Sequence, residues 1–139
     1  MNDCLFCKIL SGQIPCDKVY EDASTFAFLD LNPVNPGHTL VVHKHHHADI
    51  FDTPEKDLCE IFATAKKISC AVLSATKCDG INIGMNNKPA AGQAVFHAHV
   101  HVIPRSSSDG LKPWPHKKQA PEQQKATAVS ITKALSEFS

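Results

Sequence analysis

The spacing of apolar residues along the chain changes several times, and each change predicts a new element. A short helix is predicted over residues 4–10, where apolar side chains fall on adjoining faces, and Gly12 and Pro15 end it. Strands are predicted where β-branched and aromatic residues gather between turn residues, at 19–20, 25–30, 38–43, 81–85 and 95–103. The segments 32–37 and 86–94 are predicted loops.

The strongest helical pattern follows position 53. Thr53 suits the cap of a helix, Pro54 suits its first turn, and Asp79-Gly80 suits its end. Between them one apolar face recurs at spacings of three and four, made by Leu58, Ile61, Phe62, Ala65, Ile68 and Val72. Another helix is predicted from Pro121, with a seam of Ala128, Ile131, Leu135 and Phe138. The pattern predicts an α+β fold with an antiparallel five-stranded sheet, one long helix and shorter terminal helices.

Length and charge restrict the class of protein. A chain of 139 residues predicts a single domain over 1–139. Lys and Arg number 14, as do Asp and Glu, so no basic field favours binding to nucleic acid. The N-terminus lacks the pattern of a secretory signal, and no apolar run is long enough to span a membrane, so we expect a cytoplasmic protein. Its six cysteines are then expected to be reduced.

Histidine is the unusual residue of this chain: there are nine, and three of them alternate at His97, His99 and His101. In a strand alternate side chains share a face, so the three rings are predicted to line one side about 7 Å apart along the backbone. Imidazole serves as a nucleophile, as an acid or base, or as a metal ligand. A catalytic site in which all three bind zinc, and a surface strand with scattered histidines, remain open alternatives.

The pair Cys4-Leu5-Phe6-Cys7 is a second chemical signal. Two thiolates at this spacing form half of a zinc site, and the same spacing occurs in redox-active pairs. A closed tetrahedral site needs two further ligands. The remaining cysteines show no such spacing.

The run His97-Ala98-His99-Val100-His101-Val102-Ile103 resembles the signature of the histidine triad (HIT) family, in which histidines alternate with apolar residues. Further similarity lies in Phe28-Leu29-Asp30, in 37–41, and in Gly92-Gln93. The motif-bearing core is about 3–105, with a tail at 106–139, and the order of motifs is similar to the Hint-like bacterial branch. The resemblance implies a HIT-like fold, a homodimer, and hydrolysis or transfer at the α-phosphate of a nucleotide.

The resemblance also implies roles for individual residues. His99 would attack phosphorus and form a covalent nucleotidyl-histidine, with His97, His101 and His38 completing the catalytic network. Substrate contacts would come from Asp30 on the ribose, from Asn86, Gly92 and Gln93 near the phosphate, and from a base pocket of Leu5, Phe6, Ile9, Phe28 and Leu31. The family usually has Ser or Thr where this chain has Ala94, which implies weaker assistance to a phosphoramidate leaving group.

For metal, the resemblance implies a structural zinc ion (Zn2+) held by Cys4, Cys7, His46 and His97, with His45 and His47 as alternatives to His46. Each assignment also has a simpler interpretation: Leu5, Phe6 and Ile9 as helix core, Asp30 as a turn cap, Asn86 and Gly92 as loop residues, and His38 as a buried histidine. The expected activity is hydrolysis of purine nucleotide phosphoramidates or related conjugates. Hydrolysis of dinucleoside polyphosphates, nucleotidyl transfer, and a nucleotide-binding regulatory role with incidental hydrolysis remain open.

Overall fold

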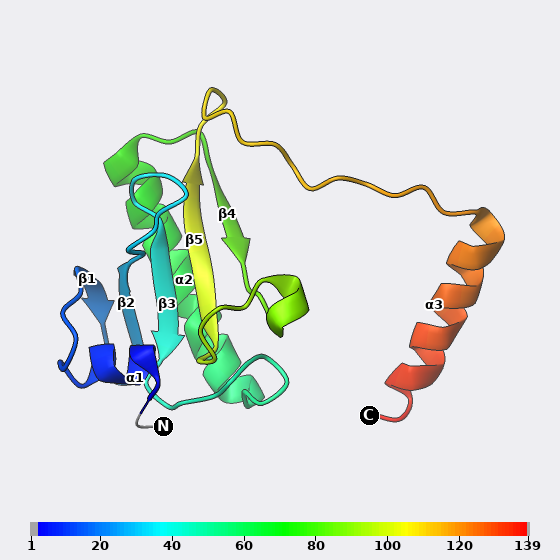
Figure 1. Cartoon of the computed structure of the whole chain (residues 1–139), viewed down its shortest axis with the longest axis horizontal. Helices are drawn as coiled ribbons and strands as arrows, with labels where there is room; N and C mark the ends of the chain where they lie inside the picture. The colour runs from blue at the N-terminus through cyan, green and yellow to red at the C-terminus, as the bar shows by residue number, and fades with distance from the viewer. Residues whose placement is uncertain (1–2, 139) are drawn as a thin grey trace. The chain divides into compact units, whose positions relative to one another are not determined.

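The computed structural model of the protein describes residues 3–138, and the chain divides into two compact units. The first ends at Asp109, and the second begins at Gly110 (Figure 1). The second unit holds an extended segment followed by helix α3 (Pro121–Leu135), and α3 has no buried residue. Within the described residues, no helix combines the length and apolar character needed to cross a membrane.

A five-stranded antiparallel sheet forms the centre of the first unit, in the order β1-β2-β3-β5-β4. Its strands are β1 (Lys18–Glu21), β2 (Thr25–Leu29), β3 (Thr39–His43), β4 (Gly80–Gly84) and β5 (His99–Arg105). The predicted fold class is confirmed: the sheet carries one long helix, α2 (Glu55–Thr76), and a short one, α1 (Leu5–Leu10). A 3-10 turn, η1 (Pro89–Ala91), lies in the connection from β4 to β5.

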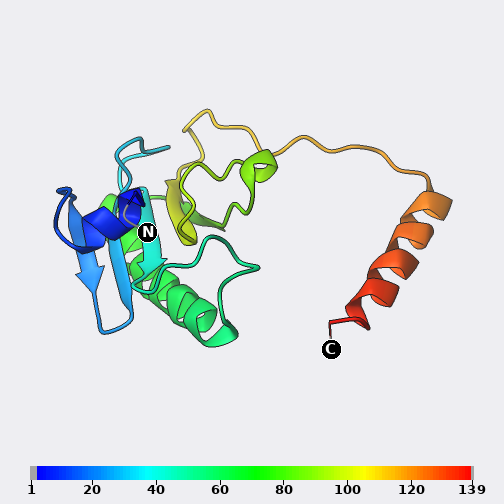
Figure 2. The same cartoon turned by 60° about the horizontal axis from the view of Figure 1, so that its bottom comes forward.

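Helix α2 packs against one face of the sheet, as Figures 1 and 2 show. Alternate residues of the three central strands point toward it, because neighbouring side chains in a strand take opposite faces. The resulting core contains Ala27, Val41, Val100, Val102, Ile61, Ala65, Ile68 and Val72. The apolar stripe predicted for α2 is therefore confirmed at Ile61, Ala65, Ile68 and Val72, whereas Phe62 is 42% exposed.

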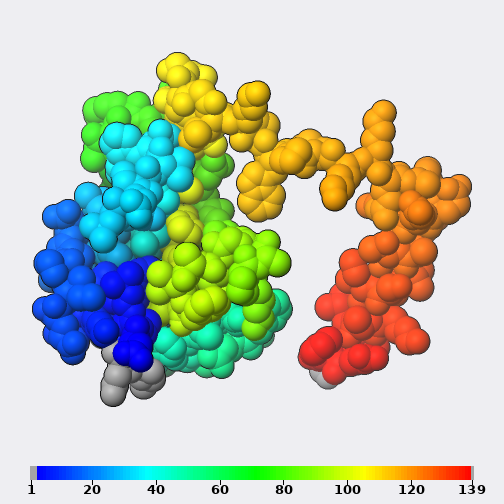
Figure 3. All heavy atoms as spheres, viewed as in Figure 1, coloured from blue at the N-terminus to red at the C-terminus, as the bar shows by residue number. Residues whose placement is uncertain are grey.

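The opposite face packs against α1. Its core contains Phe6 and Ile9 from α1 with Phe26, Phe28, Leu40 and Val42 from the sheet. His99 and His101 of β5 pair with Val42 and Leu40 of β3, so the two imidazoles emerge on this second face. Figure 3 shows α1, the segment after β2 and the β4–β5 connection gathered on that side of the sheet.

The boundaries of β5 and α2 differ from the sequence-based prediction for reasons that the structure shows. The strand predicted at 95–103 spans His99–Arg105 instead, so His97 precedes the strand. The reason is local pairing: the backbone N–H of Ala98 donates to the carbonyl of His47 at 2.7 Å, outside the sheet. Thr53 does not cap α2, since its hydroxyl donates to the carbonyl of Asp49. Helix α2 ends before the predicted Asp79-Gly80, at the left-handed Lys77.

Candidate active site and metal centre

His99 is held by its own strand and by α1. The residue is 6% exposed, and its ring packs against that of Phe6 in a T-shaped arrangement with a centroid separation of 5.0 Å. Its Nδ1 lies 2.7 Å from the carbonyl oxygen of His97, and a carbonyl can only accept, so Nδ1 carries the proton. The other nitrogen, Nε2, is left with a lone pair in the neutral ring. This is the tautomer that a nitrogen nucleophile requires.

His101 receives its tautomer from His38. The backbone N–H of Val34 donates to Nδ1 of His38 at 3.0 Å, so the proton of that ring sits on Nε2. That Nε2–H donates to Nδ1 of His101 at 2.9 Å, and His101 therefore carries its own proton on Nε2. The rings of His99 and His101 lie 5.0 Å apart, closer than the backbone spacing predicts. The site thus pairs a lone pair on His99 with an N–H donor on His101.

Burial keeps these rings neutral. It lowers the pKa of His99, with the hydrogen bond to the carbonyl of His97 acting in the opposite direction. Burial also lowers the pKa of His38, against the attraction of Asp30. For His101, burial comes first and the neighbouring His99 and His38 add to it, which lowers the pKa to about 4. Neutral imidazoles are therefore the forms present near pH 7.

The polar residues expected around a substrate lie on the loops beside this row. Asp30 follows β2, with one carboxylate oxygen accepting from the backbone N–H of Asn32 at 2.8 Å and the other 3.5 Å from Nε2 of His38. The turn-capping interpretation of Asp30 therefore describes one oxygen only. Gly92 has a φ of +91° and lies beside the side chain of Asn86.

The side chain of Gln93 holds the β4–β5 connection in place through hydrogen bonds. It is 5% exposed, and its amide oxygen accepts from the backbone N–H of Lys88 at 2.8 Å. Its amide nitrogen donates to the carbonyls of Ala48 and Val95. These bonds use the whole amide to hold the β4–β5 connection against the segment after β3.

The five apolar residues expected to line a base pocket fall into two groups. Phe6, Ile9 and Phe28 belong to the buried core under α1, as the simpler interpretation of that helix predicts. Leu5 is 38% exposed and Leu31 is 73% exposed. An apolar ligand surface on this side therefore depends on the two exposed leucines, with the aromatic core beneath them.

Four candidate metal ligands come together beside the histidine row. Nδ1 of His97 lies 3.5 Å from Sγ of Cys4 and 3.6 Å from Sγ of Cys7. Nδ1 of His46 lies 3.4 Å from Sγ of Cys7 and 3.2 Å from Nδ1 of His97. In a tetrahedral zinc site, bond lengths near 2.1 and 2.3 Å place ligand atoms about 3.3 Å (N to N) and about 3.6 Å (N to S) apart. The donor set and its spacing fit zinc.

The orientation of His97 supports this fit. Its Nε2 donates to the carbonyl of His43 at 2.9 Å, which leaves Nδ1 with the lone pair that a metal needs. Burial lowers the pKa of His97 to about 4, so the ring is neutral and able to coordinate. His46, and not its neighbours, turns toward the cysteines. The expected ligand set Cys4, Cys7, His46 and His97 is therefore the one that the fold assembles.

A second group of donors was not expected from the sequence. His43, His45 and His47 gather around Asp57 at the start of α2. His47, an alternative to His46 in the sequence-based zinc prediction, instead bonds to Asp57, and its side chain is only 16% exposed. A signal was present in the sequence, since three histidines alternate over 43–47, although nothing local indicated Asp57 as their partner.

The HIT domain family model matches residues 11–108. An adenylylsulfatase named HINT3 from Arabidopsis thaliana is 43% identical over 110 residues, which is 79% of this chain and 56% of that protein. The chain therefore spans just over half the length of that relative. The adenosine 5'-monophosphoramidase hnt1 of Schizosaccharomyces pombe is 36% identical over 134 residues, 95% of this chain and 98% of that one.

Solved structures agree with this relationship. A protein from Streptococcus mutans superposes with a TM-score of 0.90 at 43% identity, over 97% of this chain and 87% of that one. A zinc-bound histidine triad family protein from Mycobacterium smegmatis superposes with a TM-score of 0.77 at 35% identity, over 96% and 98%. The fold and its histidine row thus define the class of protein, and the chain belongs to the HIT domain family. The two named relatives are nucleotide hydrolases.

Proposed function

We propose that this protein hydrolyses purine nucleotide phosphoramidates, or related nucleotidyl conjugates, through a covalent intermediate on His99. The proposal is supported by one observation above others. The carbonyl of His97 holds the proton of His99 on Nδ1 at 2.7 Å, and burial lowers the pKa of the ring, so Nε2 carries a lone pair at neutral pH.

The chemistry proceeds in two displacements. Nε2 of His99 attacks the α-phosphorus, an N–P bond forms, and the bond from phosphorus to the leaving nitrogen breaks. The leaving amine takes a proton from water, and the carbonyl of His97 stabilises the N–H of the now cationic ring. Water then attacks the same phosphorus and gives its proton to the hydroxide left by the first step, the bond to Nε2 breaks, and the nucleoside monophosphate leaves with neutral His99 restored. His101 donates its Nε2–H to a phosphate oxygen and stabilises the charge that develops there.

Substrate recognition is assigned to the residues around the row. The carboxylate of Asp30 accepts charge-assisted hydrogen bonds from the ribose hydroxyls. Leu5 and Leu31 contact the base over the core formed by Phe6, Ile9 and Phe28. Asn86 and Gly92 border the phosphate, and Gln93 acts there by holding the loop in place.

A variant of His99 tests the proposal directly. His99→Asn keeps an amide N–H near the position of Nδ1 but has no nucleophile at Nε2. We expect turnover of an adenosine phosphoramidate to fall at least a thousandfold, while calorimetric binding of the monophosphate persists. Intact mass under denaturing conditions, after rapid quenching, should show a nucleotidyl adduct on the wild type and none on the variant.

Two controls separate this proposal from its alternatives. His116→Gln changes a histidine of the second unit and should leave adduct and turnover intact. Hydrolysis at the wild-type rate by His99→Asn would refute the nucleophile. Tight nucleotide binding with turnover at background in the wild type would instead favour the regulatory role.

The leaving group is the part of the substrate that the site selects least, since Ala94 has no hydroxyl to bond near it. A relative named an adenylylsulfatase shares this family, which makes sulfate a natural leaving group to compare with amines. Rates on an adenosine phosphoramidate, adenylyl sulfate and a dinucleoside polyphosphate, measured side by side, would rank these substrates.

We further propose a structural zinc ion on Cys4, Cys7, His46 and His97, supported by their spacing and by the zinc-bound relative. When bound, zinc would link α1 to the segments that carry His46 and His97. His97 lies two residues before the proposed nucleophile His99. A homodimer in the cytoplasm completes the proposal. Light scattering after gel filtration tests the dimer, and a mass near the 15.1 kDa of one chain would refute it.

A further inference from the structure

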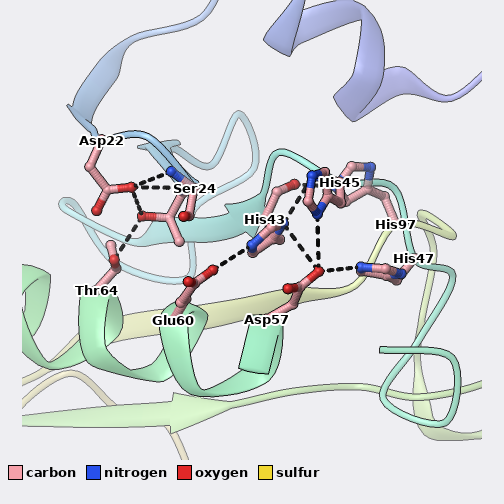
Figure 4. A network of polar contacts seen from close by, with 10 residues as sticks. Asp22, Ser24, His43, His45, His47, Asp57, Glu60, Thr64 and His97 are labelled. Carbon is pink, nitrogen blue, oxygen red and sulfur yellow. Dashed lines mark hydrogen bonds and ion pairs between the residues drawn. The ribbon is translucent and has the colours of Figure 1, made fainter. Parts of the chain in front are cut away.

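The segment 43–47 carries two sets of ligands on its two sides. The side chains of His43, His45 and His47 turn toward Asp57, whereas Nδ1 of His46 lies 3.4 Å from Sγ of Cys7. Figure 4 shows His43, His45 and His47 around Asp57 at the start of α2. We propose that His43, His45, His47 and Asp57 form a second metal site, for a divalent transition ion of the zinc class.

The donor atoms have the spacing of a coordination sphere. Oδ2 of Asp57 lies 2.8 Å from Nε2 of His47 and 3.2 Å from Nδ1 of His45. The same oxygen lies 3.6 Å from Nδ1 of His43, and all four ligand atoms are within 4.8 Å of one another. The edges of a tetrahedron around a zinc-sized ion are about 3.3 Å long, so only small side-chain movements admit the ion.

A carboxylate already holds one of these rings in the orientation that a metal needs. Nε2 of His43 donates to Oε2 of Glu60 at 2.8 Å, which leaves the lone pair of Nδ1 toward Asp57. Metal-binding histidines commonly donate their second nitrogen to a carboxylate in this way, which fixes the tautomer and strengthens the ligand. In the absence of an ion, Nδ1 of His43 accepts from the backbone N–H of His45 at 2.9 Å, and the ion replaces that bond.

Charge and access are also suitable. Three neutral imidazoles and the carboxylate of Asp57 leave one positive charge with a divalent ion, which Glu60 neutralises. Nitrogen donors favour zinc, nickel, copper or cobalt over magnesium and calcium, which prefer oxygen. The side chain of His45 is 75% exposed, so solvent reaches the site, while that of Asp57 is 11% exposed. An ion there would fasten the segment after β3 to the start of α2.

The two sites meet at a single residue without sharing a ligand. The backbone carbonyl of His43 accepts from Nε2 of His97, a ligand of the proposed thiolate site, while the side chain of His43 serves the second site. Thiolates occur only in the first set, so the two sites differ in their spectra. Cobalt bound to sulfur gives intense near-ultraviolet charge-transfer bands, and cobalt bound to nitrogen and oxygen gives weak visible bands alone.

The experiment uses the full chain without a purification tag, stripped with chelator and titrated with cobalt and, separately, with zinc. Native mass spectrometry counts ions while absorbance identifies the donors. We expect two ions per wild-type chain. His45→Gln and His47→Gln should bind one, with the thiolate band retained. Cys7→Ser should lose the thiolate band and keep the second ion. His116→Gln, the matched control, should bind two.

Two further outcomes bear on the assignment. Glu60→Gln should weaken the second ion roughly tenfold to a hundredfold while the thiolate band is unchanged, as loss of an orienting carboxylate does. His45 is exposed, so its variant should fold, and circular dichroism checks this. A wild-type chain that binds a single ion, or a second ion that survives unchanged in both His45→Gln and His47→Gln, would overturn the proposal.

Discussion

His38 offers a test that separates its two hydrogen bonds by two substitutions. Nδ1 of His38 accepts from the backbone of Val34, and its Nε2 donates to His101. The amide oxygen of Asn can take the place of Nδ1, so His38→Asn keeps the loop bond and loses the bond to His101. The longer Gln reaches the place of Nε2, so His38→Gln keeps the donor to His101 and loses the acceptor for Val34.

The magnitudes follow from the burial of this ring, which is 3% exposed. A neutral hydrogen bond contributes about 0.5–1.5 kcal/mol net, and tenfold in rate corresponds to about 1.4 kcal/mol. His38→Asn frees the proton of His101 to shift to Nδ1, so kcat should fall roughly twofold to tenfold. His38→Gln leaves the partly buried backbone N–H of Val34 unpaired, at a cost of about 1–3 kcal/mol in stability. It should nevertheless retain more turnover than His38→Asn.

Urea unfolding and steady-state kinetics on a phosphoramidate measure the two effects in the same preparations. A larger kcat loss with His38→Gln than with His38→Asn would refute the assignment of tautomers along this chain of rings. Equal losses in both would show that His38 acts by packing alone. Chemical shifts of the His101 ring nitrogens would report the tautomer directly.

Three other predictions concern pH, metal and leaving group. Folding lowers the pKa of His101 from 6.5 to about 4, so between these pH values the unfolded chain binds a proton that the folded chain does not. The contribution of His101 to the free energy of unfolding should therefore be constant above pH 6.5 and decrease as the pH falls from 6.5 toward 4. In urea titrations His101→Asn should reduce this pH dependence, and an unchanged dependence would contradict the prediction. Chelation should lower Tm by roughly 10 °C, because this is the shift in Tm expected when a domain of this size loses ~3 kcal/mol of stabilisation by a bound metal. Added zinc should restore Tm. The same Tm with and without chelator would exclude a structural metal. Ala94→Ser should raise turnover of phosphoramidates more than that of adenylyl sulfate, because the new hydroxyl can bond to a leaving nitrogen; an unchanged ratio of the two rates would show that the missing hydroxyl does not matter.

Local sequence patterns determined the main secondary structure elements of this protein and the spacing of residues within them. The apolar stripe of α2, the β-branched and aromatic runs of β2 and β3, and the spacing of Cys4 and Cys7 are properties of short segments, which local patterns can predict. The position of His99 and His101 on one face follows from the period of two in a strand. The α+β class follows from the order of the strand and helix patterns along the chain. Periodicity also predicted a strand through His97, which is wrong, because the backbone of Ala98 pairs with His47 outside the sheet.

Tertiary structure decided the partners. Asp57 lies 10 residues from His47 along the chain, and Cys7 lies 39 residues from His46, so no local pattern connects either pair. The tautomer of His99 depends on a carbonyl two residues away, but that of His101 depends on His38, 63 residues distant. Sequence determines which side chains share a face of one element, whereas only packing brings the faces of different elements into contact.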